Sequence, residues 1–172
     1  MHLLHLLRHA KSGRDEGVED RERTLSKRGR EAARAIGKLL PETIGAVDLV
    51  LCSSSVRTRE TAELVLAAYP KPPRVLFEDG LYLVGKAALL QRLRRLDEDC
   101  ESVLLIGHNP AVHQLAVALA EPHSTNFAAL ADGKFPTTAR ASLRINGSWA
   151  TLETGRNRLT AYVTPKSLGI ED

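Results

Sequence analysis

The sequence predicts an α/β fold, a three-layer α/β/α sandwich whose sheet is mostly parallel with antiparallel edge strands. Three observations favour this class. Short apolar runs of strand length alternate with amphipathic stretches of helical length up to about residue 120. Three of these runs end in polar residues, as strands of open α/β sheets do near a ligand site. After residue 120 the pattern changes to strand-like alternation, which predicts antiparallel strands at the sheet edge.

Composition limits the classes of protein to consider. A chain of 172 residues with 43% hydrophobic residues suits a single domain, which we expect to span residues 1–172. Its 24 basic and 21 acidic residues give a net charge of only +3, and 4% aromatic content offers little surface for stacking bases. We therefore expect no nucleic-acid partner.

The cysteines and the N-terminus indicate a compartment. Cys52 and Cys100 are too few for a disulfide framework and fit a reducing environment. The first apolar run has no basic region ahead of it and is interrupted by His5, which is not the pattern of a signal peptide. No apolar run approaches the ~20 residues that span a bilayer. We expect a cytoplasmic protein that does not bind a membrane.

Strand and helix signals alternate in the first half of the chain. Ser26 can accept a hydrogen bond from the first turn of a helix, and Pro41 lacks the N–H that a helix interior needs. In order, the predicted elements are a strand over residues 3–7, a solvated polar loop over 11–24, a helix from Ser26 to about Leu40, a strand over 48–52 and a helix over about 57–69 that Pro70, Pro72 and Pro73 end.

The second half begins in the same way and ends differently. Pro110 suits the first position of a helix, with Asn109 as its cap, and Asn146-Gly147 is typical of a two-residue hairpin turn. The predicted elements are strands over 75–77 and 103–106, helices over 86–96 and about 110–120, a hairpin that pairs 141–145 with 149–152, and a last strand over 159–163.

Three predicted strands end in groups that suit a phosphoryl group. The first ends in Arg8 and His9, the second is followed by serines and Arg57, and the strand over 103–106 is followed by His108. The last two also precede helix N-termini, whose free N–H groups favour an anion. If these strands are neighbours, two guanidiniums and two imidazoles face one pocket.

These segments, taken in order, resemble the histidine phosphatase superfamily. Within it, the chain is most similar to the small phosphohistidine phosphatases of the SixA type, which implies a phosphoglycerate mutase-like fold. The matching segments are LRHAKS over residues 7–12, CSSSVRTRETA over 52–62, GHNP over 107–110, Leu25, Gly29 and KFPT over 134–137. One departure is Ser55, which stands where the family usually has proline; we expect little effect from it.

The resemblance implies roles for individual residues. His9 is the nucleophile and becomes transiently phosphorylated, while Arg8, Arg57 and His108 hold the phosphoryl oxygens. Ser12 and Asn109 are further expected phosphate ligands. This chemistry needs charge stabilisation and positioning, and an imidazole nucleophile with one nitrogen unprotonated. It implies neither a metal nor a cofactor.

The general acid is the open question of the site. Ester-cleaving relatives carry a glutamate shortly after the third strand, and the nearest carboxylates here are Glu78 and Asp79. We regard both as candidates for the acid but favour their interpretation as solvated loop residues. A phosphohistidine substrate releases an imidazole, a better leaving group than an alkoxide, and needs no dedicated acid. The expected partner is therefore a phosphorylated substrate, with a histidine-phosphorylated protein as the leading class.

Alternative functions use the same residues. One is a phosphatase of small phosphate esters or anhydrides. Another is a phosphoglycerate mutase, which the lack of an evident acid and of a substrate-enclosing insertion makes less favourable. A third is a non-catalytic module that binds a phosphorylated ligand. The presence of both His9 and His108 argues against this module, since a binder has no use for a nucleophile.

Some other motifs receive structural interpretations. Cys52 and Arg57 are separated by four residues rather than the five of a cysteine phosphatase loop, so we expect Cys52 to be a small buried residue. On a strand, His5 and His9 lie about 13 Å apart, too far for one metal ion. His113, on the helix after His108, could face the pocket, but we favour a place in the core or on the surface. We interpret the basic residues Arg21, Arg23, Lys27, Arg28, Arg30 and Arg34 as solvated surface rather than a docking site for an acidic partner.

Overall fold

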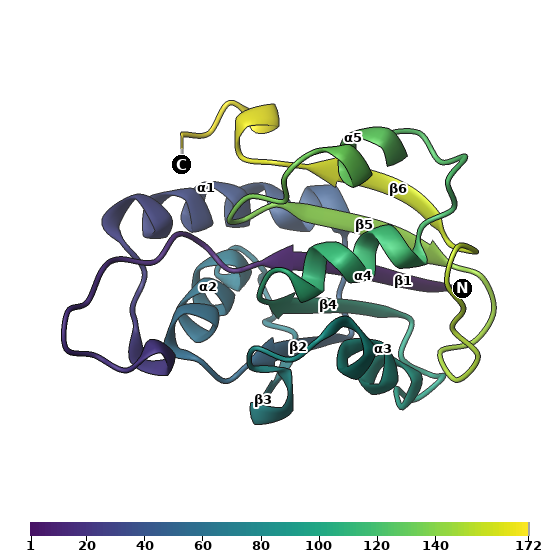
Figure 1. The fold of residues 1–172 in the computed structure, drawn as a ribbon, viewed down its shortest axis with the longest axis horizontal. Helices are drawn as coiled ribbons and strands as arrows, with labels where there is room; N and C mark the ends of the chain where they lie inside the picture. The colour runs from purple at the N-terminus through teal and green to yellow at the C-terminus, as the bar shows by residue number, and fades with distance from the viewer. Residues whose placement is uncertain (172) are drawn as a thin grey trace.

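Figure 1 shows a computed structural model of the chain, in which residues 1–171 are described. One six-stranded sheet has the order β3-β2-β4-β1-β5-β6. Its strands are β1 (His2–Arg8), β2 (Leu49–Ser53), β3 (Arg74–Glu78), β4 (Ser102–Gly107), β5 (Arg140–Ile145) and β6 (Arg158–Val163). The first four pair in parallel, whereas β1 with β5 and β5 with β6 pair antiparallel. This confirms the predicted sheet, with both antiparallel pairings on one side of it.

Helices cover both faces of the sheet. They are α1 (Lys27–Ile44), α2 (Val56–Leu66), α3 (Lys86–Arg94), α4 (Ala111–Leu119) and α5 (Phe127–Asp132), with short 3-10 turns η1 (Asp20–Glu22), η2 (Asp79–Leu81) and η3 (Lys166–Leu168). Side chains alternate along a strand, so β1 contributes Leu4 and Leu6 to one core and Leu7 to the other. The first core contains side chains of α3, α4 and α5, and the second contains side chains of α1 and α2. The predicted three-layer sandwich is confirmed (Figure 1).

Helix α1 begins as predicted and ends later than predicted. Ser26 caps it, because its hydroxyl accepts a hydrogen bond from the Gly29 N–H at 3.0 Å. The prediction that Pro41 stops the helix is wrong, since α1 continues to Ile44. Proline removes only one backbone hydrogen bond. The last turn closes with the Gly45 N–H donating to the Pro41 carbonyl at 3.1 Å, and the φ of 72° at Gly45 then turns the chain away from the helix.

The predicted hairpin between 141–145 and 149–152 is wrong. Strand β5 pairs instead with β6, which confirms the last predicted strand, and residues 146–157 form the connection. Trp149 accounts for the difference because its side chain is fully buried and its indole N–H donates to the Cys100 carbonyl at 2.7 Å. The backbone N–H groups of Trp149 and Ala150 both donate to the Glu98 carboxylate. Burial of the indole fixes this loop and prevents a second short strand.

Two smaller differences concern helices. Helix α5 is a short helix that the sequence did not predict. The expected cap of α4 is wrong, because the Asn109 side chain donates to the Phe135 carbonyl at 2.8 Å instead of capping the helix. Within residues 1–171, no helix has the length and apolar character that crossing a membrane requires.

Candidate active site

The site lies where three parallel strands end. Arg8, the last residue of β1, pairs in register with Gly107 of β4, and Cys52 of β2 pairs with Ile106. The next residues, His9, His108 and Ser53, therefore reach the same edge of the sheet, the usual ligand position in such folds. The His9 N–H also donates to the Gly107 carbonyl at 3.1 Å, which holds the two strand ends together.

His9 is buried and uncharged. Its Nδ1 lies 2.7 Å from the Ala10 carbonyl oxygen, which can only accept, so Nδ1 carries the proton and Nε2 keeps its lone pair. Burial lowers the His9 pKa to about 3, against the opposing effect of the Ala10 hydrogen bond, and the charges of His108, Arg57 and Arg8 lower it further. At neutral pH, His9 is a fixed neutral imidazole with an available nitrogen.

His108 is the second imidazole of the site. Its ring centroid lies 5.3 Å from that of His9, and its Nε2 lies 2.8 Å from the Ser53 hydroxyl. Arg57 Nη2 can only donate and lies 3.5 Å from His108 Nδ1, so Nε2 carries the proton. Burial, followed by the charge of Arg57, lowers the His108 pKa to about 4. A bound phosphoryl dianion would favour protonation of His108, because it adds negative charge beside the ring.

Two guanidiniums flank the imidazoles. Arg57 lies in the first turn of α2, which Ser55 caps by accepting from the Thr58 N–H, and its side chain is only 5% exposed. Arg8 Nη1 donates to the Phe135 carbonyl at 3.1 Å. Two arginines beside two neutral imidazoles give this pocket a positive potential that suits a phosphoryl group.

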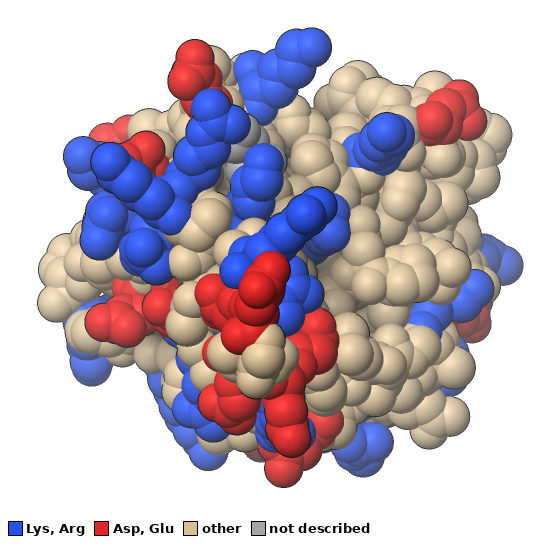
Figure 2. Space-filling view, turned by 60° about the vertical axis from the view of Figure 1, so that its left-hand side comes forward, with Lys and Arg blue, Asp and Glu red and all other residues tan. Residues whose placement is uncertain are grey.

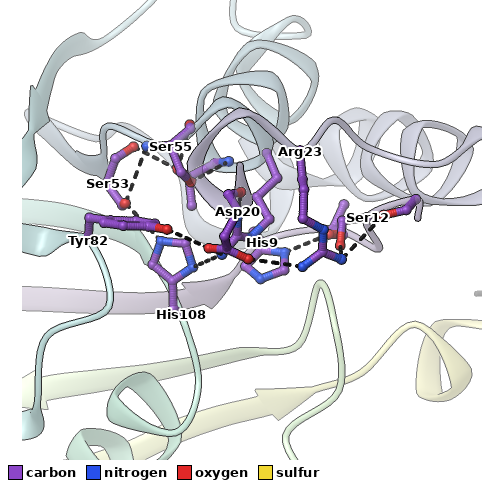
Figure 3. A network of polar contacts seen from close by, with 12 residues as sticks. His9, Ser12, Asp20, Arg23, Ser53, Ser55, Tyr82 and His108 are labelled. Atoms are coloured by element: carbon purple, nitrogen blue, oxygen red, sulfur yellow. Dashed lines mark hydrogen bonds and ion pairs between the residues drawn. The ribbon is translucent and has the colours of Figure 1, made fainter. Parts of the chain in front are cut away.

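Turn η1 brings a carboxylate into the site. Arg57 donates to the Asp20 carbonyl at 2.8 Å through Nη1 and to the Asp20 carboxylate at 3.0 Å through Nη2. In Figure 3, Asp20 lies between Tyr82 and Arg23, which donate to it at 2.5 and 3.1 Å. The Tyr82 hydrogen bond comes first among the causes that lower the Asp20 pKa to about 2. Asp20 is therefore ionised at neutral pH.

The interpretation of residues 11–24 as a solvated loop is therefore wrong for its C-terminal part. Asp20 and Arg23 are tied to the site, and Arg21 donates hydrogen bonds to Ser54 and Asp79. Arg21 and Arg23 are thus not simply part of a solvated basic surface. Sequence reasoning missed Asp20 and Tyr82, because a charged residue in a polar segment and a single tyrosine carry no spacing signal.

The two additional phosphate ligands that the sequence suggested lie near the site but have other partners. The Ser12 hydroxyl accepts from Arg23 Nη2 at 2.7 Å. The Asn109 amide N–H₂ and Arg8 donate to the same Phe135 carbonyl. Their contact with phosphate stays a prediction.

Neither candidate acid is placed to donate a proton. Both oxygens of Glu78 accept from Arg92, at 2.8 and 2.9 Å. The Asp79 side chain is 80% exposed and pairs with Arg21. Hydrogen bonds from Ser54 and Arg21 lower the pKa of Asp79 below its usual value. An ionised carboxylate cannot act as a general acid.

The remaining candidates lie outside the chemistry of the site. Cys52 is fully buried, and burial raises its pKa to about 12, which removes the reactive thiolate. The His5 ring lies 2.6 Å from the Ser142 hydroxyl, and the His113 ring donates to the Leu130 carbonyl. Among residues 1–171, no three His, Cys, Asp or Glu side chains form a group that could hold a metal ion.

The side of the molecule toward which β1 points carries both signs of charge. The long loop between β1 and α1 lies on this side, at the left of Figure 1, and Figure 2 turns it toward the viewer. Acidic side chains gather near the lower centre of this face and basic side chains toward its upper left.

Comparisons with known proteins agree with this fold and this geometry. The profile of the histidine phosphatase superfamily (branch 1) matches residues 4–81. An uncharacterised protein of Mycobacterium tuberculosis is 34% identical over 163 residues, which cover 93% of this chain and all of that protein.

Two solved structures extend the comparison. A protein of Nakamurella multipartitia, described as a candidate phosphohistidine phosphatase SixA, is 32% identical with a TM-score of 0.81, covering 95% of this chain and 96% of that one. A protein of Agrobacterium tumefaciens with the same description is 27% identical with a TM-score of 0.80, covering 95% and 98%. The chain belongs to the histidine phosphatase superfamily and is SixA-like, and these neighbours support a phosphatase.

Proposed function

We propose that this chain is a phosphatase that acts through a phosphorylated His9, and that its substrate is phosphohistidine in a protein. One observation carries the proposal. His9 is buried as a neutral imidazole with Nδ1 fixed by the Ala10 carbonyl, beside Arg8, Arg57 and His108. A neutral nitrogen aimed into an anion pocket is the arrangement that nucleophilic phosphoryl transfer requires.

In the first half-reaction, His9 Nε2 attacks phosphorus while Arg8 and Arg57 stabilise the charge on the equatorial oxygens. The His9 ring gains positive charge as the bond to phosphorus forms. The Ala10 carbonyl stabilises this charge by accepting the Nδ1 proton in a hydrogen bond. His108 adds a hydrogen-bond donor to the phosphoryl group once the bound dianion has raised its pKa.

In the second half-reaction, water attacks the phosphorylated His9 and releases inorganic phosphate. The leaving group is then the His9 imidazole, which takes back the electron pair of the P–N bond and becomes neutral again. Its low pKa in the unliganded site favours this neutral product. Turnover needs no protonated carboxylate in this step.

The environment of the carboxylates supports the substrate class. Glu78 is paired with Arg92, and Asp79 is exposed with a lowered pKa. A site in which neither candidate carboxylate is placed to donate a proton suits a leaving group that needs no acid, and an imidazole is such a group, unlike an alkoxide. Comparison of a phosphohistidine peptide with an alkyl phosphate tests this class: we expect the peptide to be hydrolysed at least 100-fold faster. Equal rates would favour a phosphatase of small esters.

Trapping the phosphorylated enzyme tests the mechanism. Incubation with a labelled phosphodonor, followed by a rapid quench, is expected to leave acid-labile phosphate on a peptide that contains His9. His9→Ala is expected to incorporate no label. Cys52→Ala is the matched control, because the Cys52 thiol is buried and protonated and its removal is expected to leave labelling intact. Label that survives acid, or that disappears in Cys52→Ala, would disprove the mechanism.

A further inference from the structure

Asp20 places a carboxylate directly against one of the four predicted catalytic side chains. Its carboxylate and its carbonyl each accept from Arg57, one through each terminal nitrogen. The second N–H of Nη2 lies toward His108 Nδ1, and Nη1 carries a second N–H of its own. Arg57 can therefore hold Asp20 and, through Nη1, a phosphoryl oxygen at the same time.

Asp20 lies on the solvent side of the pocket. Its side chain is 44% exposed, whereas that of Arg57 is 5% exposed and the residue His9 is 7% exposed. In-line transfer places the leaving group opposite the nucleophile. Because His9 is buried, the leaving group departs toward solvent, and Asp20 is an exposed carboxylate held against Arg57 of the same pocket.

The charge of Asp20 disfavours most phosphorylated substrates. Tyr82, Arg23 and Arg57 all donate to its carboxylate and keep it ionised. An ionised carboxylate beside the site repels a dianionic ester and has no proton for an alkoxide. It stabilises a substrate only if the leaving group brings a positive charge or an N–H donor.

We propose that the Asp20 carboxylate accepts a hydrogen bond from the far ring nitrogen of the substrate imidazole and so selects phosphohistidine over phosphate esters. This inference rests on the proposed function and names the residue that sets its substrate class. In this arrangement, the histidine that gives up the phosphoryl group and the histidine that receives it are held in the same way. His9 and the substrate histidine each hold a proton on the nitrogen away from phosphorus, the first against the Ala10 carbonyl and the second against Asp20.

The step balances without any added proton. The substrate enters with phosphorus on one ring nitrogen and a proton on the other, so its ring is cationic. His9 Nε2 forms a bond to phosphorus, and the substrate P–N bond breaks with its electron pair returning to the substrate nitrogen. The substrate leaves as a neutral imidazole that keeps its proton, and the positive charge passes to the His9 ring.

The test is a ratio of two activities in Asp20→Asn, an isosteric change that removes the charge. The probes are a phosphohistidine peptide and p-nitrophenyl phosphate, whose leaving group needs no acid and has no N–H. We expect the ratio of kcat/KM for the peptide to that for the aryl phosphate to fall about 10-fold or more, the size of one hydrogen bond to a charged group. Asp20→Glu, which keeps the charge, is expected to restore part of the ratio.

Glu19→Gln is the matched control, because it removes one exposed carboxylate from the neighbouring position. It is expected to leave the ratio unchanged. An unchanged ratio in Asp20→Asn would overturn the inference. If both activities fell equally, Asp20 would only position Arg57. Failure of the proposed function would look different, since the parent protein itself would then not prefer the peptide.

Discussion

Burial controls the charge of the site's histidines. Both His9 and His108 are buried, and burial is the main cause that lowers their pKa values, to about 3 and about 4. The same burial leaves Arg57 charged, because a guanidinium keeps its proton and gains the Asp20 carboxylate as a partner. In the same buried surroundings, the imidazole of His9 is therefore a neutral nucleophile and the guanidinium of Arg57 is a permanent cation.

The protonation state of His9 can be observed directly. We predict that ¹⁵N NMR of the unliganded protein at pH 6 shows His9 as a neutral imidazole protonated on Nδ1, because its pKa lies far below that pH. A cationic His9 at pH 6, or a proton on Nε2, would contradict this assignment.

At the scale of elements, α2 matters most because it carries Arg57. Ser55 fixes its start, and α1 holds it from the side through a close contact of backbones. A Cβ at Gly37 of α1 would lie 2.6 Å from the Leu64 carbonyl oxygen and 2.9 Å from Val65 Cα. Only glycine allows the two helices to approach in this way, so the position of Arg57 depends on a residue of another helix.

Gly37→Ala is predicted to destabilise the protein. Alanine favours a helix by about 1 kcal/mol over glycine, but the clash with α2 backbone outweighs this gain. We expect the free energy of unfolding to fall by about 1–3 kcal/mol, the usual cost of overpacking, and phosphatase activity to fall with it. Urea denaturation measures the loss.

Gly85→Ala serves as the control for that substitution. Gly85 precedes α3, and a Cβ at this position would have no heavy atom within 4 Å beyond its chain neighbours, so no clash arises. We expect its free energy of unfolding to stay within about 1 kcal/mol of the parent value. Equal stability of the two variants would show that α1 and α2 can separate without cost.

For the whole molecule, buried neutral histidines predict sensitivity to acid. His5 lies in the core of the sheet, and burial lowers its pKa from 6.5 to about 4. Between these values the unfolded chain binds a proton that the folded chain does not. The contribution to stability is therefore complete above pH 6.5 and is lost as the pH falls toward 4.

His5→Gln tests this linkage away from the active site. Each such histidine makes the free energy of unfolding fall by about 2 kcal/mol between pH 6.5 and 5. The parent protein is therefore expected to lose about 2 kcal/mol more than the variant over this interval, whatever the variant's stability at pH 7. Parallel pH profiles in urea denaturation would show that His5 is not neutral in the fold.

The layers of the fold and the strand ends that form the site could be predicted from the sequence. Arg8, His9, Arg57 and His108 could be found because each follows a periodic element, and parallel strands bring such positions to one edge. The predicted hairpin does not form because the burial of Trp149 outweighs a local turn signal. Asp20 was missed because its contacts with Arg57 and Tyr82 come from residues 37 and 62 positions away in the chain. Contacts between residues so far apart in the chain cannot be predicted from the spacing of neighbouring residues.

The central claim is that four side chains surround one tetrahedral anion, with His9 in line for attack. The other three are Arg8, Arg57 and His108. A crystal structure of the protein with vanadate measures this most directly. We predict vanadium bonded to His9 Nε2, with Arg8, Arg57 and His108 each within about 3 Å of a vanadate oxygen. Vanadate bound elsewhere, or bound here without contact to His9, would contradict the account.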